Sequence, residues 1–341
     1  MAQPLTFQEI IMKYIESPSN NPRWNLALEE YVFSHMDPKE EYFMLWQNHN
    51  TIVIGKNQNT VAEINTDVVQ EKDITVVRRL SGGGAVYHDM GNLNFSFIAD
   101  AKNMGEINFK RFCLPVVKTL REMGVPAEVN GRNDMVIAGR KFSGNAQYTK
   151  QGRVLHHGTL MFSSDLTTVA DALRPNRLKL ETKGIASVSS RVCNISEFLP
   201  EDVTLADFKQ ALLRNIMGQD SPAPYIFTDH DRAQIDKLMQ QRYSQWEWNY
   251  GFSPRYQVIK ERRIEGCGML QLSMDIDKGV IRDIQFLGDF FDYGNLDALS
   301  VLLCGCSIEK KALQKTLHHE DVSECIRGLQ NDQLIDLITE G

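Results

Sequence analysis

The chain has 341 residues, with 37 Lys and Arg against 44 Asp and Glu, which gives a net charge of −7. This mildly acidic balance argues against a general nucleic-acid binder, because such proteins neutralise phosphates with cationic side chains. A hydrophobic content of 42% is ordinary for a globular protein, and a chain of 341 residues exceeds the size at which one core usually keeps growing, so two domains are expected.

The composition indicates neither a membrane protein nor a zinc protein. No apolar stretch approaches the roughly 20 residues that cross a bilayer, and the first residues lack the features of a signal peptide. We therefore expect a cytoplasmic protein with neither a membrane nor a nucleic acid as partner. The 6 cysteines are scattered without CxxC spacing, which favours reduced thiols over disulfides or a zinc site.

The first predicted elements are a helix and the beginning of a sheet. The helix has Asn21 as its cap and Pro22 at its first position. Residues 42–46 and 51–55 are rich in β-branched and aromatic side chains, and the short polar stretch between them predicts that they pair with each other. Residues 92–99 alternate apolar and polar side chains, which indicates a further strand.

The next elements alternate between helical and β-rich segments. Residues 108–124 predict a helix that ends at its glycine, and several short β segments follow it. Helical patterns return at 205–218 and 231–243. This order favours an α+β fold with a mixed, mostly antiparallel sheet flanked by helices over regular βαβ alternation.

A change of pattern marks the domain boundary. Residues 246–256 combine aromatic side chains with Gly251 and Pro254, and a small sheet followed by short helices is expected after them. We predict a first domain over residues 1–245, a linker over 246–256 and a small C-terminal α+β domain over 257–341.

The stretch "RRLSGGGAVYHD" at residues 78–89 contains three consecutive glycines, which weaken any helix or strand that holds them. The Walker phosphate loop does not fit, because Ala85 and Val86 follow Gly84 where a lysine and a hydroxyl residue are needed. The dinucleotide-binding pattern also fails, since it needs a glycine where Tyr87 stands. A glycine turn can nevertheless offer backbone N–H groups to an anion.

Charged side chains near this turn extend the anion hypothesis. Arg78 or Arg79 can bind a phosphate with two hydrogen bonds, although a plain β-turn with exposed arginines explains the pattern as well. In "GRNDMVIAGRKFSGNAQY" at 131–148, the pattern KxxGxA places Lys141 three residues before a glycine. If these turns converge with "HHGTLMF" at 156–162, they form one anion-handling pocket, in which Asp134 can hold Mg²⁺ together with phosphate oxygens.

These motifs resemble those of lipoate-protein ligases of the two-domain bacterial A type. The resemblance rests on residues 78–97, 131–148, 156–160 and 183–195, and it extends over most of residues 11–250. The residues that follow "WEWNYG" resemble the accessory domain of that family. The expected fold is therefore a biotin/lipoate ligase-like catalytic domain with a C-terminal accessory domain.

The resemblance implies an ATP-dependent ligase that works in two steps. Lipoate attacks the α-phosphate of ATP to give lipoyl-AMP and pyrophosphate, and a lysine of an apo lipoyl domain then accepts the lipoyl group as an amide. The implied cofactors are ATP and Mg²⁺. The implied partners are lipoyl-domain proteins, namely the E2 subunits of 2-oxoacid dehydrogenases and the glycine cleavage H protein, and the enzyme is expected to act as a monomer.

The resemblance also assigns residues to this reaction. Lys141 is the implied catalytic residue, because a cation there offsets the repulsion between a carboxylate and a phosphate. Asp134 is the implied metal ligand. The implied ATP-binding residues are Arg79, Gly84, Ala85, Val86, Tyr87, Asn133 and Lys141. The implied lipoate-binding residues are Glu29, Trp46, Ser81, Gly83, Lys141, Leu155 and His157.

Several alternatives stay open at the level of sequence. Trp46 is as consistent with core packing as with ligand contact, and Glu29 is consistent with an exposed helix position. Cys193 stands where many relatives carry a small polar residue, but no neighbouring group activates its thiol, so we interpret it as structural. A cysteine-dependent octanoyl or lipoyl transferase, a non-catalytic binder and a biotin ligase are the competing functions. The preferred acceptor, the use of octanoate or lipoamide and the oligomeric state are not fixed by the sequence.

Overall fold

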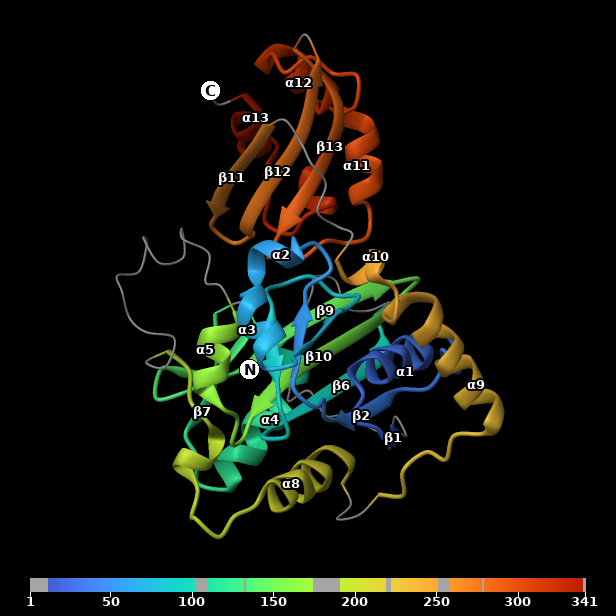
Figure 1. Ribbon diagram of the computed structural model, residues 1–341, viewed down its shortest axis with the longest axis vertical. Coiled ribbons are helices and arrows are strands. Elements are labelled where there is room, and N and C mark those ends of the chain that lie inside the picture. Colours follow the sequence, from blue (N-terminus) through green and yellow to red (C-terminus); the bar gives the residue numbers. More distant parts are fainter. Residues whose placement is uncertain are drawn as a thin grey trace, which may run out of the picture.

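A computed structural model describes residues 12–101, 109–131, 133–173, 191–218, 222–250, 258–277 and 279–339. The largest element in this part of the chain is a seven-stranded sheet (Figure 1). In spatial order its strands are β1 (Lys13–Glu16), β2 (Tyr42–Trp46), β6 (Asn92–Asp100), β10 (Arg153–Met161), β9 (Arg140–Lys150), β8 (Asp134–Ile137) and β7 (Ala127–Asn130). β1 and β2 are parallel and the other neighbours are antiparallel, so the predicted mixed, mostly antiparallel sheet is confirmed.

A smaller sheet carries the glycine turn. Its strands, in spatial order, are β4 (Thr75–Arg78), β3 (Thr51–Ile54) and β5 (Val86–His88). The predicted pairing of residues 42–46 with 51–55 is therefore wrong, because β2 joins the large sheet and β3 the small one. Asn50 adopts a left-handed conformation with φ 39°, which redirects the chain between the two strands.

Helices flank both faces of the large sheet. Helix α1 begins as predicted, since the Asn21 side chain accepts a hydrogen bond from the backbone N–H of Arg23 and Pro22 is the first residue of the helix. The helical segments of this region are α1 (Pro22–His35), α2 (Thr60–Glu63), α3 (Thr66–Glu71), α4 (Phe109–Glu122), α5 (Leu166–Ala172), η1 (Ile195–Phe198), α8 (Leu205–Met217), α9 (Asp229–Leu238), η2 (Met239–Tyr243) and α10 (Trp246–Asn249).

Alternation along the strands sends neighbouring side chains into two different cores. Leu93, Phe95 and Phe97 of β6 pack with α4 and α8 on one face, as the sequence alternation predicted. Trp46 and Leu155 belong to the other face, where they pack with α1, α9 and η2. The face covered by α1 is the one that lines the candidate site.

The C-terminal part builds its own sheet and core. Its strands β11 (Val258–Ile264), β12 (Gly268–Asp277) and β13 (Val280–Gly288) form an antiparallel sheet, and α11 (Leu296–Leu303), α12 (Lys310–Thr316), η3 (Val322–Glu324) and α13 (Asn331–Thr339) follow. The apolar side chains of these elements form a separate core cluster. The predicted small sheet followed by short helices is therefore present.

The end of β13 touches the glycine turn of the first domain. The backbone N–H of Gly83 donates to the carbonyl of Phe290 at 3.2 Å, and Lys56 Nζ lies 2.8 Å from Asp292 Oδ1. In Figure 1 the C-terminal unit, coloured orange to red, lies at one end of the molecule next to α2. Residues 246–250 of the predicted linker pack on β4, where Trp248 Nε1 donates to the Arg78 carbonyl, and residues 251–256 lie outside the described residues.

No helix in the described part of the chain is long and apolar enough to cross a membrane.

Candidate active site

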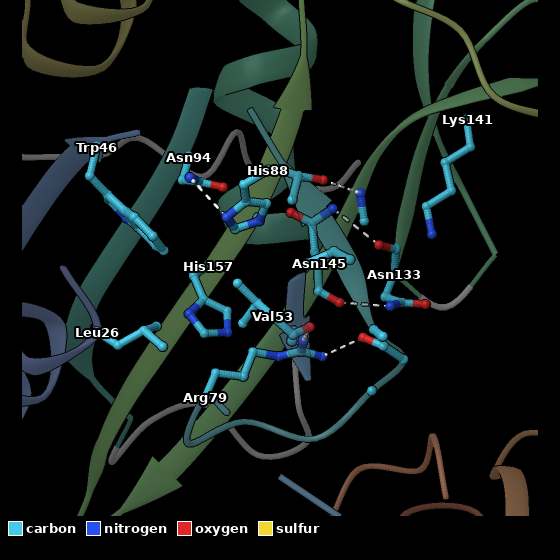
Figure 2. A pocket seen from close by; sticks show the side chains of 18 residues that line it. Leu26, Trp46, Val53, Arg79, His88, Asn94, Asn133, Lys141, Asn145 and His157 are labelled. Atoms are coloured by element: carbon cyan, nitrogen blue, oxygen red, sulfur yellow. Dashed lines mark hydrogen bonds between the residues drawn. The ribbon is translucent and has the colours of Figure 1, made fainter. Parts of the chain in front are cut away.

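A pocket opens between the glycine turn and the face of the large sheet that α1 covers (Figure 2). Figure 2 shows Leu26 and Trp46 on one side of the pocket, Lys141 on the opposite side and His88 between them. The side with Leu26 and Trp46 is apolar, whereas the side with Lys141 is cationic. The lining residues are Leu26, Trp46, Val53, Arg79, Gly83, Gly84, Ala85, Val86, His88, Asn94, Asn133, Lys141, Gly144, Asn145, Ala146, His157, Gly158 and Thr159.

The two arginines at the end of β4 have different tasks. Arg78 is 1% exposed, and its guanidinium donates to the carbonyls of Gly55, Lys56 and Gln58, so it is a structural residue. Arg79 lines the pocket. Burial lowers the pKa of Arg79 to about 10, which still leaves the guanidinium charged at neutral pH.

Arg79 holds the glycine turn from beneath. One of its terminal nitrogens donates to the carbonyls of Gly82 and Gly84, at 2.7 and 2.9 Å. These bonds turn the two carbonyls toward the arginine and keep residues 82–84 at the mouth of the pocket. Gly83 has φ +90°, and a Cβ at position 82 would lie 2.3 Å from the carbonyl oxygen of Phe290, so both positions require glycine.

A chain of buried hydrogen bonds joins Arg79 to α1. Arg79 Nε donates to Ser81 Oγ at 3.0 Å, and Ser81 Oγ lies 2.5 Å from His157 Nε2. His157 Nδ1 lies 2.8 Å from Glu29 Oε1. Although serine, histidine and carboxylate follow one another as in a hydrolase triad, Ser81 is fully buried and bound to the guanidinium. The chain therefore positions Arg79 and His157, and it offers no exposed nucleophile.

The same carboxylate orients the indole at the apolar end. Ser96 Oγ donates to Glu29 Oε1 at 2.6 Å, and Trp46 Nε1 donates to Ser96 Oγ at 2.9 Å. Glu29 is 2% exposed, so the alternative of an exposed helix position for this residue is wrong. The Glu29 carboxylate thus fixes side chains on both the polar and the apolar side of the pocket.

Lys141 reaches the pocket from β9. Its Nζ lies 2.7 Å from Asp134 Oδ1, and each of these two side chains is 38% exposed. A register shift between β8 and β9 occurs beside Lys141, and such irregularities redirect side chains. A Cβ at position 144 would lie 3.0 Å from Lys141 Nζ, so the glycine of the KxxGxA pattern leaves room for the ammonium group.

Asn133 and Asn145 join the turn before β8 to β9. Asn133 Nδ2 donates to the Asn145 carbonyl at 2.6 Å, and Asn145 Nδ2 donates back to the Asn133 carbonyl at 3.0 Å. Both residues line the pocket next to Lys141. Gly158 makes room for this pair, because a Cβ there would lie 2.2 Å from Asn145 Oδ1.

The predicted site residues fall into two groups. The first group lines the pocket and consists of Trp46, Arg79, Gly83, Gly84, Ala85, Val86, Asn133, Lys141 and His157. The second group lies behind the lining: Glu29 and Ser81 bind His157, Asp134 pairs with Lys141, and Leu155 and Tyr87 are buried in core clusters. A nucleotide contact of Tyr87 would therefore involve its backbone, because its ring packs with Ile52 and Ile54.

Other lining residues were not singled out from the sequence. His88, Asn94 and Thr159 carry polar groups into the pocket, and Leu26 and Val53 add apolar surface. His88 stands inside the quoted glycine stretch, but no local pattern assigned it a task. For Asn94 the sequence did offer a signal, because the alternation along β6 predicts that it lies on the face opposite to Phe95.

Neither Cys113 nor Cys193 provides a nucleophile in this pocket. Both are fully buried and absent from its lining. Burial raises the pKa of the Cys113 thiol to about 12 and that of Cys193 to about 11, so both stay protonated at neutral pH. The interpretation of Cys193 as a structural residue agrees with this burial.

Together the fold and the pocket place an apolar wall and a cationic side chain in one cavity, an arrangement that suits an enzyme acting on an acid with a hydrocarbon chain. Residues 21–217 match the family model of the lipoyl protein ligase A/B catalytic domain, and residues 253–338 match that of the bacterial lipoate protein ligase C-terminus. The chain therefore belongs to the lipoate-protein ligase family, as its motifs predicted.

Individual relatives agree with this assignment. The chain is 43% identical to lipoate-protein ligase LplJ of Bacillus subtilis, over 96% of this chain and 100% of that protein, and 40% identical to lipoate–protein ligase 1 of Staphylococcus aureus, again over 96% and 100%. Among solved structures, P. falciparum LipL1 in complex with lipoate superimposes with a TM-score of 0.78 at 25% identity, covering 96% of this chain and 98% of that one. A lipoate-protein ligase A bound with ATP gives a TM-score of 0.62 at 26% identity, covering 72% and 99%.

Proposed function

We propose that this protein uses ATP to activate lipoate as lipoyl-AMP and then transfers the lipoyl group to a lysine of apo lipoyl domains. The observation that carries this proposal is the position of Lys141 across the pocket from Leu26 and Trp46 (Figure 2). An acid whose hydrocarbon part lies against Trp46 directs its carboxylate toward the ammonium group. The relatives with lipoate and with ATP bound support the same pair of ligands.

In the first step, a carboxylate oxygen of lipoate attacks the α-phosphorus of ATP, and pyrophosphate leaves. Both reactants are anions, so Lys141 offsets their repulsion and stabilises the charge that builds on the phosphoryl oxygens. Arg79 fixes the glycine turn, whose residues 83–86 face the pocket and would bind the nucleotide. Asn133 lines the wall beside Lys141 and is the proposed contact for the adenylate.

Magnesium is part of the proposal because ATP enters most enzymes as its Mg²⁺ complex. Mg²⁺ is usually held by one or two carboxylates together with phosphate oxygens and water. Asp134 supplies one carboxylate of this kind, half-exposed and next to Lys141. Asp134 thus fits as a residue that would hold this ion, and the ion would neutralise phosphate charge.

In the second step, the amine of an acceptor lysine attacks the acyl carbonyl, and AMP leaves. The proposed acceptors are lipoyl domains of 2-oxoacid dehydrogenase E2 subunits and the glycine cleavage H protein, with a cytoplasmic monomer as the enzyme. One structural neighbour is described as a bi-partite ligase and its E2 lipoyl domain from Thermoplasma acidophilum, with a TM-score of 0.62 at 26% identity. The same pocket is proposed to accept octanoate as an alternative acid.

We further propose that the glycine turn and the C-terminal domain move between the two steps. The adenylate must stay shielded from water until the acceptor arrives, and loop closure is a common way to achieve this. The contact of Gly83 with Phe290 joins these two parts, so a displacement of either one affects the other. The proposed hinge at Gly251 lies outside the described residues.

Mass spectrometry of an apo lipoyl domain tests the reaction. We expect a gain of one lipoyl group after incubation with the protein, ATP, Mg²⁺ and lipoate, and no gain when ATP is omitted. A lipoylated product without ATP contradicts the proposed ligase.

Two cysteine variants separate the alternatives further. Cys113→Ser and Cys193→Ser are expected to keep pyrophosphate release that depends on lipoate, because neither thiol lines the pocket. Loss of activity in either variant, with folding retained, contradicts the proposed mechanism.

A further inference from the structure

His88 lines the pocket, and the proposed reaction does not use its buried Nε2. This residue is 3% exposed, lines the pocket and has no hydrogen-bond partner for its Nε2 among the described residues. Its ring meets the indole of Trp46 edge to face, with the ring centroids 5.9 Å apart. A buried polar atom without a partner is costly, so such an atom in a binding pocket points to a ligand group.

Hydrogen bonds to the other ring nitrogen fix which atom carries the proton. Asn48 Nδ2 lies 3.1 Å from His88 Nδ1, and Asn94 Nδ2 lies 3.4 Å from the same nitrogen (Figure 2 shows the second contact). Amide nitrogens only donate, so Nδ1 is the acceptor and the proton of the neutral ring is on Nε2.

Backbone carbonyls determine the orientation of the Asn48 amide. Asn25 Nδ2 donates to the carbonyls of Ser19 and Gln47, at 2.9 and 2.8 Å, so this nitrogen is identified without ambiguity. The same nitrogen donates to Asn48 Oδ1 at 2.9 Å, which leaves Asn48 Nδ2 to face His88. Asn94 Oδ1 accepts from Asn92 Nδ2 at 2.9 Å, which leaves Asn94 Nδ2 on the side of His88.

The ring is neutral as well as oriented. Burial, together with the positive charge of Arg79, lowers the pKa of His88 to about 3. At neutral pH the pocket therefore contains a fixed N–H donor at Nε2. This donor is buried beside Trp46, between the apolar side of the pocket and Lys141.

The geometry points to His88 Nε2–H as a hydrogen-bond donor to a dithiolane sulfur of lipoate, a contact that selects this acid over hydrocarbon acids of the same shape. The inference rests on the proposed function, since a carboxylate at Lys141 sends the far end of the acid toward Trp46 and His88. Sulfur accepts a weak hydrogen bond, whereas a methylene group accepts none and leaves the N–H without a partner. The hydrocarbon acid is therefore expected to bind less tightly than lipoate, because it leaves this buried N–H without an acceptor.

A carbocyclic analogue of lipoate tests the inference on the wild-type protein. In 5-cyclopentylpentanoate the two sulfur atoms are replaced by methylene groups, while the five-membered ring and the acid chain are kept. We expect kcat/KM for ATP-dependent pyrophosphate release to be about tenfold higher with lipoate than with the analogue. Equal values for the two acids overturn the inference.

Substitutions at His88 identify the donor. His88→Phe keeps a planar ring without the N–H, and we expect the preference for lipoate over the analogue to fall to about twofold or less. His88→Gln restores an amide donor near the same place and is expected to recover part of the preference. If His88→Phe lowers kcat/KM for both acids by the same factor, the donor does not recognise sulfur and the inference fails.

His156 provides the matched control. It is also a fully buried imidazole. It lies on the face of β10 opposite to His157, where it stacks on Phe112 outside the pocket lining. His156→Phe is expected to keep the tenfold preference, and circular dichroism confirms that each variant is folded. A wild-type protein that releases no pyrophosphate with either acid contradicts the proposed function itself, which distinguishes that failure from a failure of the inference.

Discussion

At the scale of single residues, Lys141 combines a strong expected effect on catalysis with little structural role. Its ion pair with Asp134 is 38% exposed on both sides, and pairs of this kind contribute about 0–1 kcal/mol to stability. A charge placed at the reacting phosphate contributes much more, on the order of 10²–10³ in kcat. The residue is therefore expected to separate activity from folding.

We expect Lys141→Ala to lower kcat for pyrophosphate release by about 10²–10³ and to leave the thermal midpoint nearly unchanged. Lys118→Ala is the control, because Lys118 forms an exposed ion pair with Glu122 on α4, away from the pocket. A Lys141→Ala variant that retains full activity, or that unfolds at room temperature, contradicts the proposed role.

Buried histidines predict how stability depends on pH. Burial lowers the pKa of His88 to about 3 and holds the pKa of His156 well below 6.5. Above pH 6.5 both states are neutral and the stability is complete. Below pH 6.5 the unfolded chain binds protons that the folded protein does not, so stability falls with acidification toward the folded pKa.

Between pH 6.5 and pH 5, His88 is expected to remove about 2 kcal/mol from the free energy of unfolding, and His156 lowers it in the same direction. Urea unfolding at pH 7, 6 and 5 measures the effect, and His156→Phe should show a shallower decline than the wild type. Equal slopes in the two proteins contradict this account of His156.

At the scale of elements, the glycine turn is shaped by contacts from three sides. Arg79 binds its carbonyls from beneath, β3 lies behind it and the end of β13 lies against Gly82. A Cβ at position 82 would lie 2.3 Å from the Phe290 carbonyl oxygen, whereas a Cβ at position 84 meets no atom within 4 Å. Position 84 therefore has space for a methyl group, whereas position 82 of the same turn does not.

Gly82→Ala is expected to lower the free energy of unfolding by about 2 kcal/mol, because the Phe290 backbone must shift to admit the methyl group. Gly84→Ala is expected to leave the stability within about 0.5 kcal/mol of the wild type. Thermal unfolding of both variants checks the difference, and equal midpoints contradict the close approach of Phe290.

Local signals in the sequence predicted elements better than their partners. Asn21 and Pro22 predict the start of α1 correctly, because a helix cap depends only on residues that are neighbours in the sequence. The pairing of residues 42–46 with 51–55 was predicted wrongly, since pairing depends on distant strands and Asn50 turns the chain away.

The same distinction applies to the site. The pattern KxxGxA was enough to single out Lys141, because the glycine three residues later leaves space for its ammonium group. The donor at His88 depends on Asn48 and Asn25, which are 40 and 63 positions away in the sequence, so no local pattern contains it. Buried Glu29 on α1 was ambiguous for the same reason, since its partners Ser96 and His157 come from the distant strands β6 and β10.

At the scale of the whole molecule, two adjacent phenylalanines after β13 enter different cores. Phe290 packs in the C-terminal core, whereas Phe291 packs in the core of the first domain, where its ring lies 5.4 Å from that of Phe109. Asp292 follows directly and binds Lys56 Nζ and Asn57 Nδ2, each at 2.8 Å. This short segment therefore connects the C-terminal domain to the glycine turn.

Asp292 is the polar part of this connection, and its side chain is 4% exposed. Replacing it with alanine leaves the buried Asn57 amide without that acceptor and releases Lys56, so the Phe290 carbonyl is held less firmly against Gly83. We expect Asp292→Ala to accelerate amide hydrogen exchange in residues 82–84 several-fold. Asp277→Ala removes an exposed carboxylate from the same domain, paired only with exposed Arg282 among the described residues, and should leave that exchange unchanged. Equal exchange in the two variants would show that the turn is ordered by Arg79 alone.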